Sequence, residues 1–121
     1  MVNEEDHLRI QALGKGLNIY ELYESADKVD NKLDSKLNFS YSDRLGYLTY
    51  CPSNLGTGLR ASVMMHLPAL TESGLIGKVI TSVGQMGLTV RGLYGEGTQP
   101  GGCIYQVSNQ VSLGITEKDT L

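Results

Sequence analysis

The order in which helical and strand-like segments alternate constrains the fold of this chain most. Two segments, residues 18–37 and 71–86, repeat apolar side chains at the spacing of an amphipathic helix. Shorter segments rich in strand-forming residues precede, separate and follow them. Strands that alternate with helices in this way predict an α+β fold, an antiparallel β-sheet flanked by helices in the order β-α-β-β-α-β-β. The expected strands are residues 2–13, 39–50 with a turn at 43–46, 59–67, 88–94 and 103–113.

Signals at the ends of the helices sharpen this prediction. Asn18 is a favourable N-cap, and Glu21 stands three residues later, as a capping box requires. Gly87 follows the second helical segment and is expected to end it. Thr116 and Asp119 have the same capping-box spacing, so a further helix is expected to begin near the end of the chain.

Length and composition indicate a globular chain and exclude several function classes. Its 121 residues suit a single domain, and 40% hydrophobic with 19% charged residues argue against disorder. Ten basic and thirteen acidic residues give 10 − 13 = −3, which excludes a generic nucleic-acid binder. No apolar run approaches the roughly 20 residues of a membrane helix, and we expect no signal peptide. Two cysteines are too few to form the disulfide framework typical of small secreted proteins, so we expect a reducing, cytoplasmic setting.

Three segments place charged or reactive residues where a plain core would not need them. The first, NEEDHLR at residues 3–9, would present Glu5 on one face of a strand and its acidic neighbours on the other. The second, CPSNLGTGLR at residues 51–60, follows an expected strand, and its serine and arginine could hold Cys51 as a thiolate. The third, RGLYGEGT at residues 91–98, is typical of a mobile loop that closes over a ligand. The simpler alternatives are a charged strand end, a buried structural cysteine and a hairpin tip with solvated charges.

Common nucleotide and metal signatures are absent from the sequence. It contains no GxxxxGK[ST] motif, and no GxGxxG follows an expected strand. Cysteine and histidine spacing does not fit a zinc site. His7 and His66 are isolated, and a structural role is the simpler interpretation of each.

Together the three segments resemble the motif set of the ATP:guanidino phosphotransferases, in the order of that family and over nearly the whole chain. The connecting segments GYLTYCPSNLGTGLRASVMMHLPAL and GLTVRGLYGEGTQPGGCIYQVSNQVSLG are similar to the bacterial protein-arginine kinases rather than to arginine or creatine kinases. Members with small substrates usually carry histidine at the position of Met64, beside the adenine site, and a charged residue at that of Gln106. These departures argue against a small metabolite as substrate.

The resemblance implies roles for residues at the acceptor guanidinium. A guanidinium is protonated and delocalised, so it must be aligned and must lose a proton to attack a γ-phosphate. Carboxylates suit both needs, and the resemblance assigns them to Glu5 and Glu96, either of which could be the general base. Cys51, as a thiolate, would help to orient the guanidinium, and Ser53 is placed to hydrogen-bond its sulfur. Ser53 and Asn54 would support this loop.

The second substrate implied by the resemblance is ATP with Mg²⁺. Arg9, Arg60 and Arg91 match the phosphate-binding arginines of the family and are three of the four arginines in the chain. Catalysis of phosphoryl transfer depends mainly on positioning and charge stabilisation, which these side chains would supply. Mg²⁺ would be held mainly by nucleotide oxygens and water, so no dedicated carboxylate site for the metal is expected.

The implied function is phosphorylation of arginine side chains in proteins. Two alternatives stay open: a phosphagen kinase acting on a free guanidino metabolite, and a non-catalytic module that binds phosphoarginine or ATP. The resemblance implies protein substrates, with a transcriptional repressor and Clp protease components as partners, and no direct contact with nucleic acid or membrane. The oligomeric state is left open.

The resemblance also indicates that residues 1–121 are a fragment of the catalytic domain. The family has a smaller N-terminal region before the NEEDH segment, and protein-arginine kinases continue beyond the C-terminal end. We expect the fragment to fold but to have little or no activity by itself.

Overall fold

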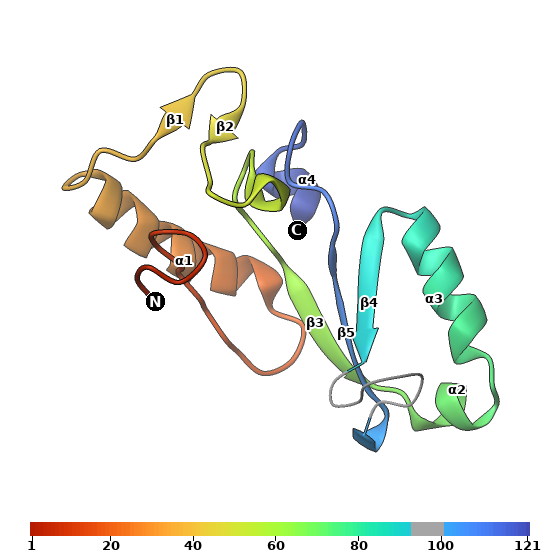
Figure 1. Cartoon of the computed structure of the whole chain (residues 1–121). Helices are drawn as coiled ribbons and strands as arrows, with labels where there is room; N and C mark the ends of the chain where they lie inside the picture. The colour runs from red at the N-terminus through yellow and green to blue at the C-terminus, as the bar shows by residue number, and fades with distance from the viewer. Residues whose placement is uncertain (93–100) are drawn as a thin grey trace. The chain divides into compact units, whose positions relative to one another are not determined.

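The computed structural model describes residues 1–92 and 101–121 (Figure 1). They form two compact units. The first consists of Met1–Leu59 and Ser112–Leu121, and the second of Arg60–Val111.

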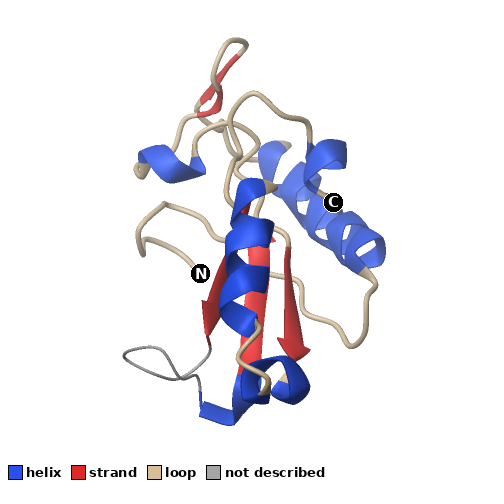
Figure 2. Ribbon diagram, turned by 90° about the vertical axis from the view of Figure 1, so that its right-hand side faces the viewer, coloured by secondary structure: helices blue, strands red, loops and turns tan. Residues whose placement is uncertain are grey.

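The second unit is built on an antiparallel three-stranded sheet. It contains β3 (Ser62–His66), β4 (Leu88–Gly92) and β5 (Ile104–Asn109), in the order β3-β5-β4. The helix α3 (Ile76–Gln85) covers one face of the sheet (Figure 2). The predicted fold class, an antiparallel sheet flanked by helices, is thus confirmed. Within the sheet, Met64 and Arg91 both pair with Gln106 of the central strand. Tyr105, on the central strand β5, is 3% exposed, and its hydroxyl lies 3.0 Å from Thr71 Oγ1.

The predicted helix over residues 71–86 is wrong in one respect, because two helices occupy this region. The first, α2 (Pro68–Glu72), begins earlier, with proline in its first turn, where a missing N–H is tolerated. Gly74 then adopts a left-handed conformation (φ +70°), which interrupts the helical path before α3 begins. Gly87 (φ +79°) ends α3 as predicted, donating its N–H to the Gly84 carbonyl. A short 3₁₀ turn, η2 (Gly101–Cys103), precedes β5.

The first unit combines a long helix with a small hairpin. Within it lie α1 (Ile19–Asp34), β1 (Tyr41–Ser42), β2 (Gly46–Tyr47), the 3₁₀ turn η1 (Pro52–Asn54) and α4 (Glu117–Thr120). Tyr41 and Tyr47 pair across the hairpin and pack edge to face, with ring centroids 5.3 Å apart. The Tyr47 hydroxyl donates to the Asp30 carboxylate at 3.4 Å, which connects the hairpin to α1. No helix in the described parts of the chain is long and apolar enough to cross a membrane.

The prediction of a first strand over residues 2–13 is wrong. In the described chain this region has only an isolated bridge between Val2 and Leu8, and the backbone folds back on itself (Figure 1). The Asn3 N–H donates to the His7 carbonyl, and Arg9 N–H donates to the Met1 carbonyl. Adjacent carboxylates are poor strand formers, and a loop keeps the Glu4 and Glu5 side chains in water.

The two expected capping boxes have different outcomes. At α4 the prediction is confirmed: Asp119 N–H donates to Thr116 Oγ1 at 3.2 Å, and Thr116 N–H donates to Asp119 Oδ2 at 3.0 Å. At α1 it is wrong, since Asn18 makes no side-chain capping bond to the backbone within the described residues. Its Nδ2 instead donates to Glu21 Oε2 at 3.5 Å, so the two side chains bond to each other.

Asp30 is predicted to make the stability of the chain depend on pH. Burial, with the nearby Asp34 and Asp27 carboxylates adding to it, raises the pKa of Asp30 above its ordinary value despite the bond from Tyr47. The folded state therefore holds this proton more tightly, and stability falls as the pH rises from the ordinary carboxyl range through the raised pKa. Asp30→Asn keeps an acceptor for Tyr47 without the charge, so we expect a higher melting temperature than wild type at neutral pH.

Thermal unfolding followed by circular dichroism between pH 4 and pH 8 tests this. The difference between Asp30→Asn and wild type should be small in acid and should grow with pH. Glu24→Gln removes one charge from an exposed position of the same helix and is the matched control. A difference that is independent of pH would contradict the prediction.

Candidate active site

The acidic segment and the cysteine loop, residues 3–9 and 51–60, are joined by one carboxylate. Asp6 Oδ1 accepts a hydrogen bond from the Tyr50 backbone N–H at 2.7 Å. Asp6 Oδ2 accepts another from Asn54 Nδ2, also at 2.7 Å. Two of the three segments singled out in the sequence are therefore in direct contact within the first unit.

Cys51 lies at the entry to a tight turn. It has extended backbone angles (φ −87°, ψ 120°), and Pro52 then begins η1. The half-buried sulfur lies 3.0 Å from Ser53 Oγ, so the serine hydroxyl stands where the sequence predicts. The Cys51 carbonyl accepts hydrogen bonds from Thr49 Oγ1 at 2.7 Å and from the Asn54 N–H at 3.0 Å. These bonds orient the backbone on both sides of the thiol.

Glu5 and Arg9, two further expected site residues, also lie together. Arg9 Nη1 is 2.7 Å from Glu4 Oε2, and Arg9 Nη2 is 3.5 Å from Glu5 Oε2. Because this segment is a loop, both glutamates reach the same guanidinium, and the strand-like separation expected for Glu5 does not occur. All three side chains are substantially exposed, so these ion pairs contribute little to stability and are free to exchange for other partners.

Arg60 and Arg91 lie in the second unit. Arg60 is exposed and lies two residues before the start of β3, and Arg91 is exposed on β4. Across the sheet from Arg91, Gln106 donates its side-chain amide to Ser62 Oγ at 3.0 Å, and the next strand presents Met64, which is 60% exposed. Glu96 lies outside the described residues, as does most of the expected closing loop.

Ser112 supports the cysteine loop, and sequence analysis missed it. Ser112 is only 8% exposed. Its hydroxyl lies within hydrogen-bond distance of the Ser53 carbonyl (3.2 Å) and the Leu55 carbonyl (2.9 Å). Its own carbonyl accepts the Thr57 N–H at 3.0 Å. No local pattern marks this serine, because its partners lie more than fifty residues earlier in the chain. The role of Asp6 was also missed, although the residue stands inside a recognised motif.

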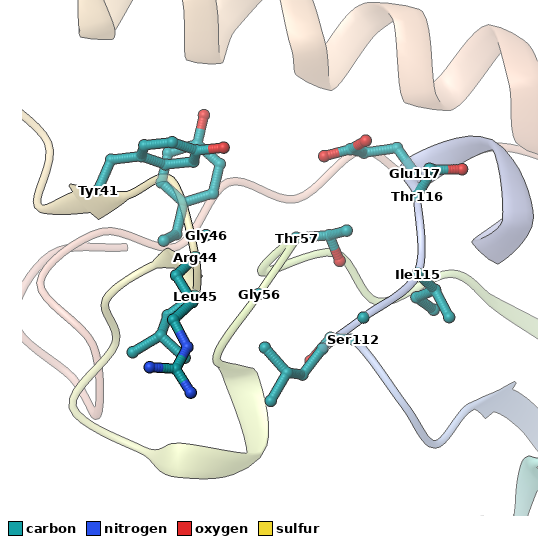
Figure 3. A pocket seen from close by; sticks show the side chains of 13 residues that line it. Tyr41, Arg44, Leu45, Gly46, Gly56, Thr57, Ser112, Ile115, Thr116 and Glu117 are labelled. Atoms are coloured by element: carbon teal, nitrogen blue, oxygen red, sulfur yellow. The ribbon is translucent and has the colours of Figure 1, made fainter.

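An open pocket of about 230 Å³ lies elsewhere in the first unit. The β1–β2 hairpin, Gly56, Thr57 and residues 112–117 line it, with Arg44 and Glu117 toward opposite ends (Figure 3). Among the described residues, none of the expected catalytic or phosphate-binding side chains lines this pocket. Among the described residues, the candidate active site is therefore defined by the Asp6 contacts.

The chain belongs to the family described as ATP:guanido phosphotransferase, C-terminal catalytic domain, whose model matches residues 1–121. It is 54% identical over 121 residues to a protein-arginine kinase from Caldanaerobacter subterraneus, covering 100% of this chain and 36% of the relative. It is 55% identical over 121 residues to one from Symbiobacterium thermophilum, covering 100% of this chain and 34% of the relative. The chain thus spans about a third of the length of these curated relatives.

Solved structures of related kinases share the fold. The duplicated taurocyamine kinase from Schistosoma mansoni with bound transition-state-analogue components matches with a TM-score of 0.83 and 39% identity, over 98% of this chain and 16% of that chain. A lombricine kinase matches with a TM-score of 0.79 and 34% identity, over 98% of this chain and 33% of that chain.

Proposed function

We propose that this chain is the catalytic part of a kinase that transfers the γ-phosphoryl group of ATP to arginine side chains of proteins. The observation that carries the proposal is the identity of 54–55% to protein-arginine kinases over the whole chain. Identity to the taurocyamine and lombricine kinases is lower, at 39% and 34%. A kinase for a free guanidino metabolite is the second candidate, which these two structural relatives favour.

The proposed chemistry at the acceptor uses carboxylates and a thiolate. Glu5 and Glu96 would align the guanidinium, and one of them would take the proton that is lost as the N–P bond forms while the bond to ADP breaks. Cys51 would add a third negative partner, supported by the Ser53 hydroxyl 3.0 Å away. Asn54, bonded to Asp6, would support the same loop.

The proposed ATP contacts are arginines. Arg9, Arg60 and Arg91 would neutralise the charge on the transferring phosphoryl group and the remaining phosphates. Arg9 is bonded to Glu4 and Glu5 through exposed ion pairs, which nucleotide phosphates would replace. Mg²⁺ would enter with the nucleotide, held mainly by its oxygens and water.

The biological setting is proposed from the same family membership. Unfolded or regulatory proteins would present the arginine side chains, and a transcriptional repressor and Clp protease components would be partners in the cytoplasm. We propose that turnover needs the parts of the relatives' length that lie outside these 121 residues.

Phosphorus NMR distinguishes the two candidate functions. One sample would contain the chain extended to the length of its relatives, ATP, Mg²⁺, free arginine and an arginine-rich unfolded protein. An acid-labile phosphoramidate signal that stays with the protein fraction supports the protein-arginine kinase, and the same signal on free arginine supports the metabolite kinase. The 121-residue chain alone should give little or no signal, and full turnover by it would contradict the proposed need for further segments.

Cys51→Ser is expected to lower turnover about ten- to a hundredfold, because it removes one charged partner of the guanidinium. The affinity for ATP should be unchanged, because no phosphate contact is assigned to the thiol. Steady-state kinetics together with an ATP titration measure both quantities. Cys103→Ser removes the other free cysteine and is the control. Unchanged turnover in Cys51→Ser would remove the thiol from the proposed chemistry, whereas a wild-type protein that binds ATP without any turnover would favour the non-catalytic binding module.

A further inference from the structure

Asp6 has no role in the proposed chemistry, yet it makes the two short contacts that join the segments of the site. Its partners, Tyr50 and Asn54, are 44 and 48 residues away in the sequence. They flank Cys51 and Ser53, so one carboxylate holds the cysteine turn at both ends. The turn is also closed internally, by the Asn54 N–H on the Cys51 carbonyl at 3.0 Å.

The chemistry of these contacts makes them stronger than ordinary surface hydrogen bonds. Hydrogen bonds to an ionised acceptor are shorter and stronger than neutral ones, and both distances here are 2.7 Å. The bond from Asn54, followed by those from the Tyr50 and Cys51 backbone, lowers the pKa of Asp6, so it stays ionised at neutral pH. Each carboxylate oxygen already has a partner, which leaves Asp6 poorly placed to bind a substrate itself.

The geometry points to Asp6 as a positioning residue that sets the spacing between Glu5 and Cys51 by clamping the Tyr50–Asn54 turn to the acidic segment. Glu5 directly precedes Asp6, so the clamp restrains the backbone from which the Glu5 carboxylate projects. The consequence for turnover rests on the proposed function, whereas the clamp itself is a property of the folded chain.

Hydrogen exchange tests the clamp without any substrate. In the chain extended to the length of its relatives, Asp6→Ala should speed exchange at the Tyr50 amide about tenfold, since that N–H loses its acceptor. Asp119→Ala is the matched control, because Asp119 also accepts a backbone and a side-chain hydrogen bond, at the start of α4. It should speed exchange at Thr116 and leave Tyr50 unchanged. Unchanged Tyr50 exchange in Asp6→Ala would overturn the inference.

The positioning role is tested by measuring the kinetics of variants in which the side chains of Asp6 and Asn54 are removed or exchanged. Asp6→Ala should lower kcat about tenfold with little change in KM for ATP. Asn54→Asp alone places two carboxylates together and should lower kcat as well. The double variant Asp6→Asn with Asn54→Asp restores a donor opposite an acceptor, and Asn at position 6 can still accept from Tyr50. We expect it to recover kcat to within about threefold of wild type.

The outcomes separate the inference from the proposed function. Faster Tyr50 exchange with an unchanged kcat, or a swap that fails to rescue, would overturn the positioning role. If Asp6→Ala does not fold, Asn54→Ala removes one bond and leaves the Tyr50 contact, and it should lower kcat by a smaller factor. If the wild-type protein phosphorylates neither arginine substrate, the proposed function fails, while the exchange experiment still supports or overturns the clamp.

Discussion

Glu5→Gln is expected to lower the rate of phosphoryl transfer about a hundredfold to ten-thousandfold, the range for loss of a positioned acid–base group. Glutamine keeps the size of the side chain and one oxygen acceptor, but it cannot take a proton from the guanidinium or offset its charge. The fall should lie mainly in kcat, because the carboxylate acts most strongly as the N–P bond forms. Initial rates at saturating ATP and acceptor measure it.

The matched control for Glu5→Gln is Glu24→Gln, which neutralises an exposed glutamate on α1. It should leave the rate within about twofold of wild type, because Glu24 has no role in the proposed site. Surface substitutions of this kind also change the stability of the fold little. Comparable rates for Glu5→Gln and Glu24→Gln would remove Glu5 from the proposed site. The assignment of Cys51 and the arginines would then need separate support.

Gly56→Ala is expected to lower the free energy of unfolding by about 3 kcal/mol or more, the combined scale of backbone strain and overpacking. Gly56 is buried and has φ +109°, which a residue with a side chain rarely adopts. A Cβ there would lie 2.2 Å from the Ser112 carbonyl oxygen and 2.7 Å from Leu113 Cα. Both are backbone atoms, so relief requires the loop to move away from the segment that supports it.

Gly77→Ala is the control for this substitution. Gly77 lies inside α3, and among the described residues no neighbouring atom lies within 4 Å of a Cβ placed there. Alanine should therefore stabilise the chain, by up to about 1 kcal/mol, through its helix propensity. Urea unfolding followed by circular dichroism compares the two variants with wild type. Equal stability of Gly56→Ala and wild type would contradict the close approach of Gly56 to Ser112.

Features that depend on neighbours along the chain were predicted well. The stop at Gly87 and the Thr116–Asp119 capping box each involve residues within one helical turn, so their physical cause can be read locally. Apolar alternation located β3, where Val63 and Met65 point inward and Met64 is exposed. Where local signals competed, prediction failed. The Asn18 side chain hydrogen-bonds to the Glu21 side chain rather than to the backbone. Gly74 interrupts the segment 71–86, for which the apolar periodicity alone predicts one helix.

By itself the sequence determined the fold class, the motifs of the family and the residues that are candidates for its chemistry. Tertiary structure alone decided how the described candidates in the first unit are held. Asp6 meets Tyr50 and Asn54 across 44 and 48 residues, and Ser112 meets Ser53 and Leu55 across 59 and 57. Such contacts leave no periodic trace, because they form only after distant segments have folded and their polar groups need partners.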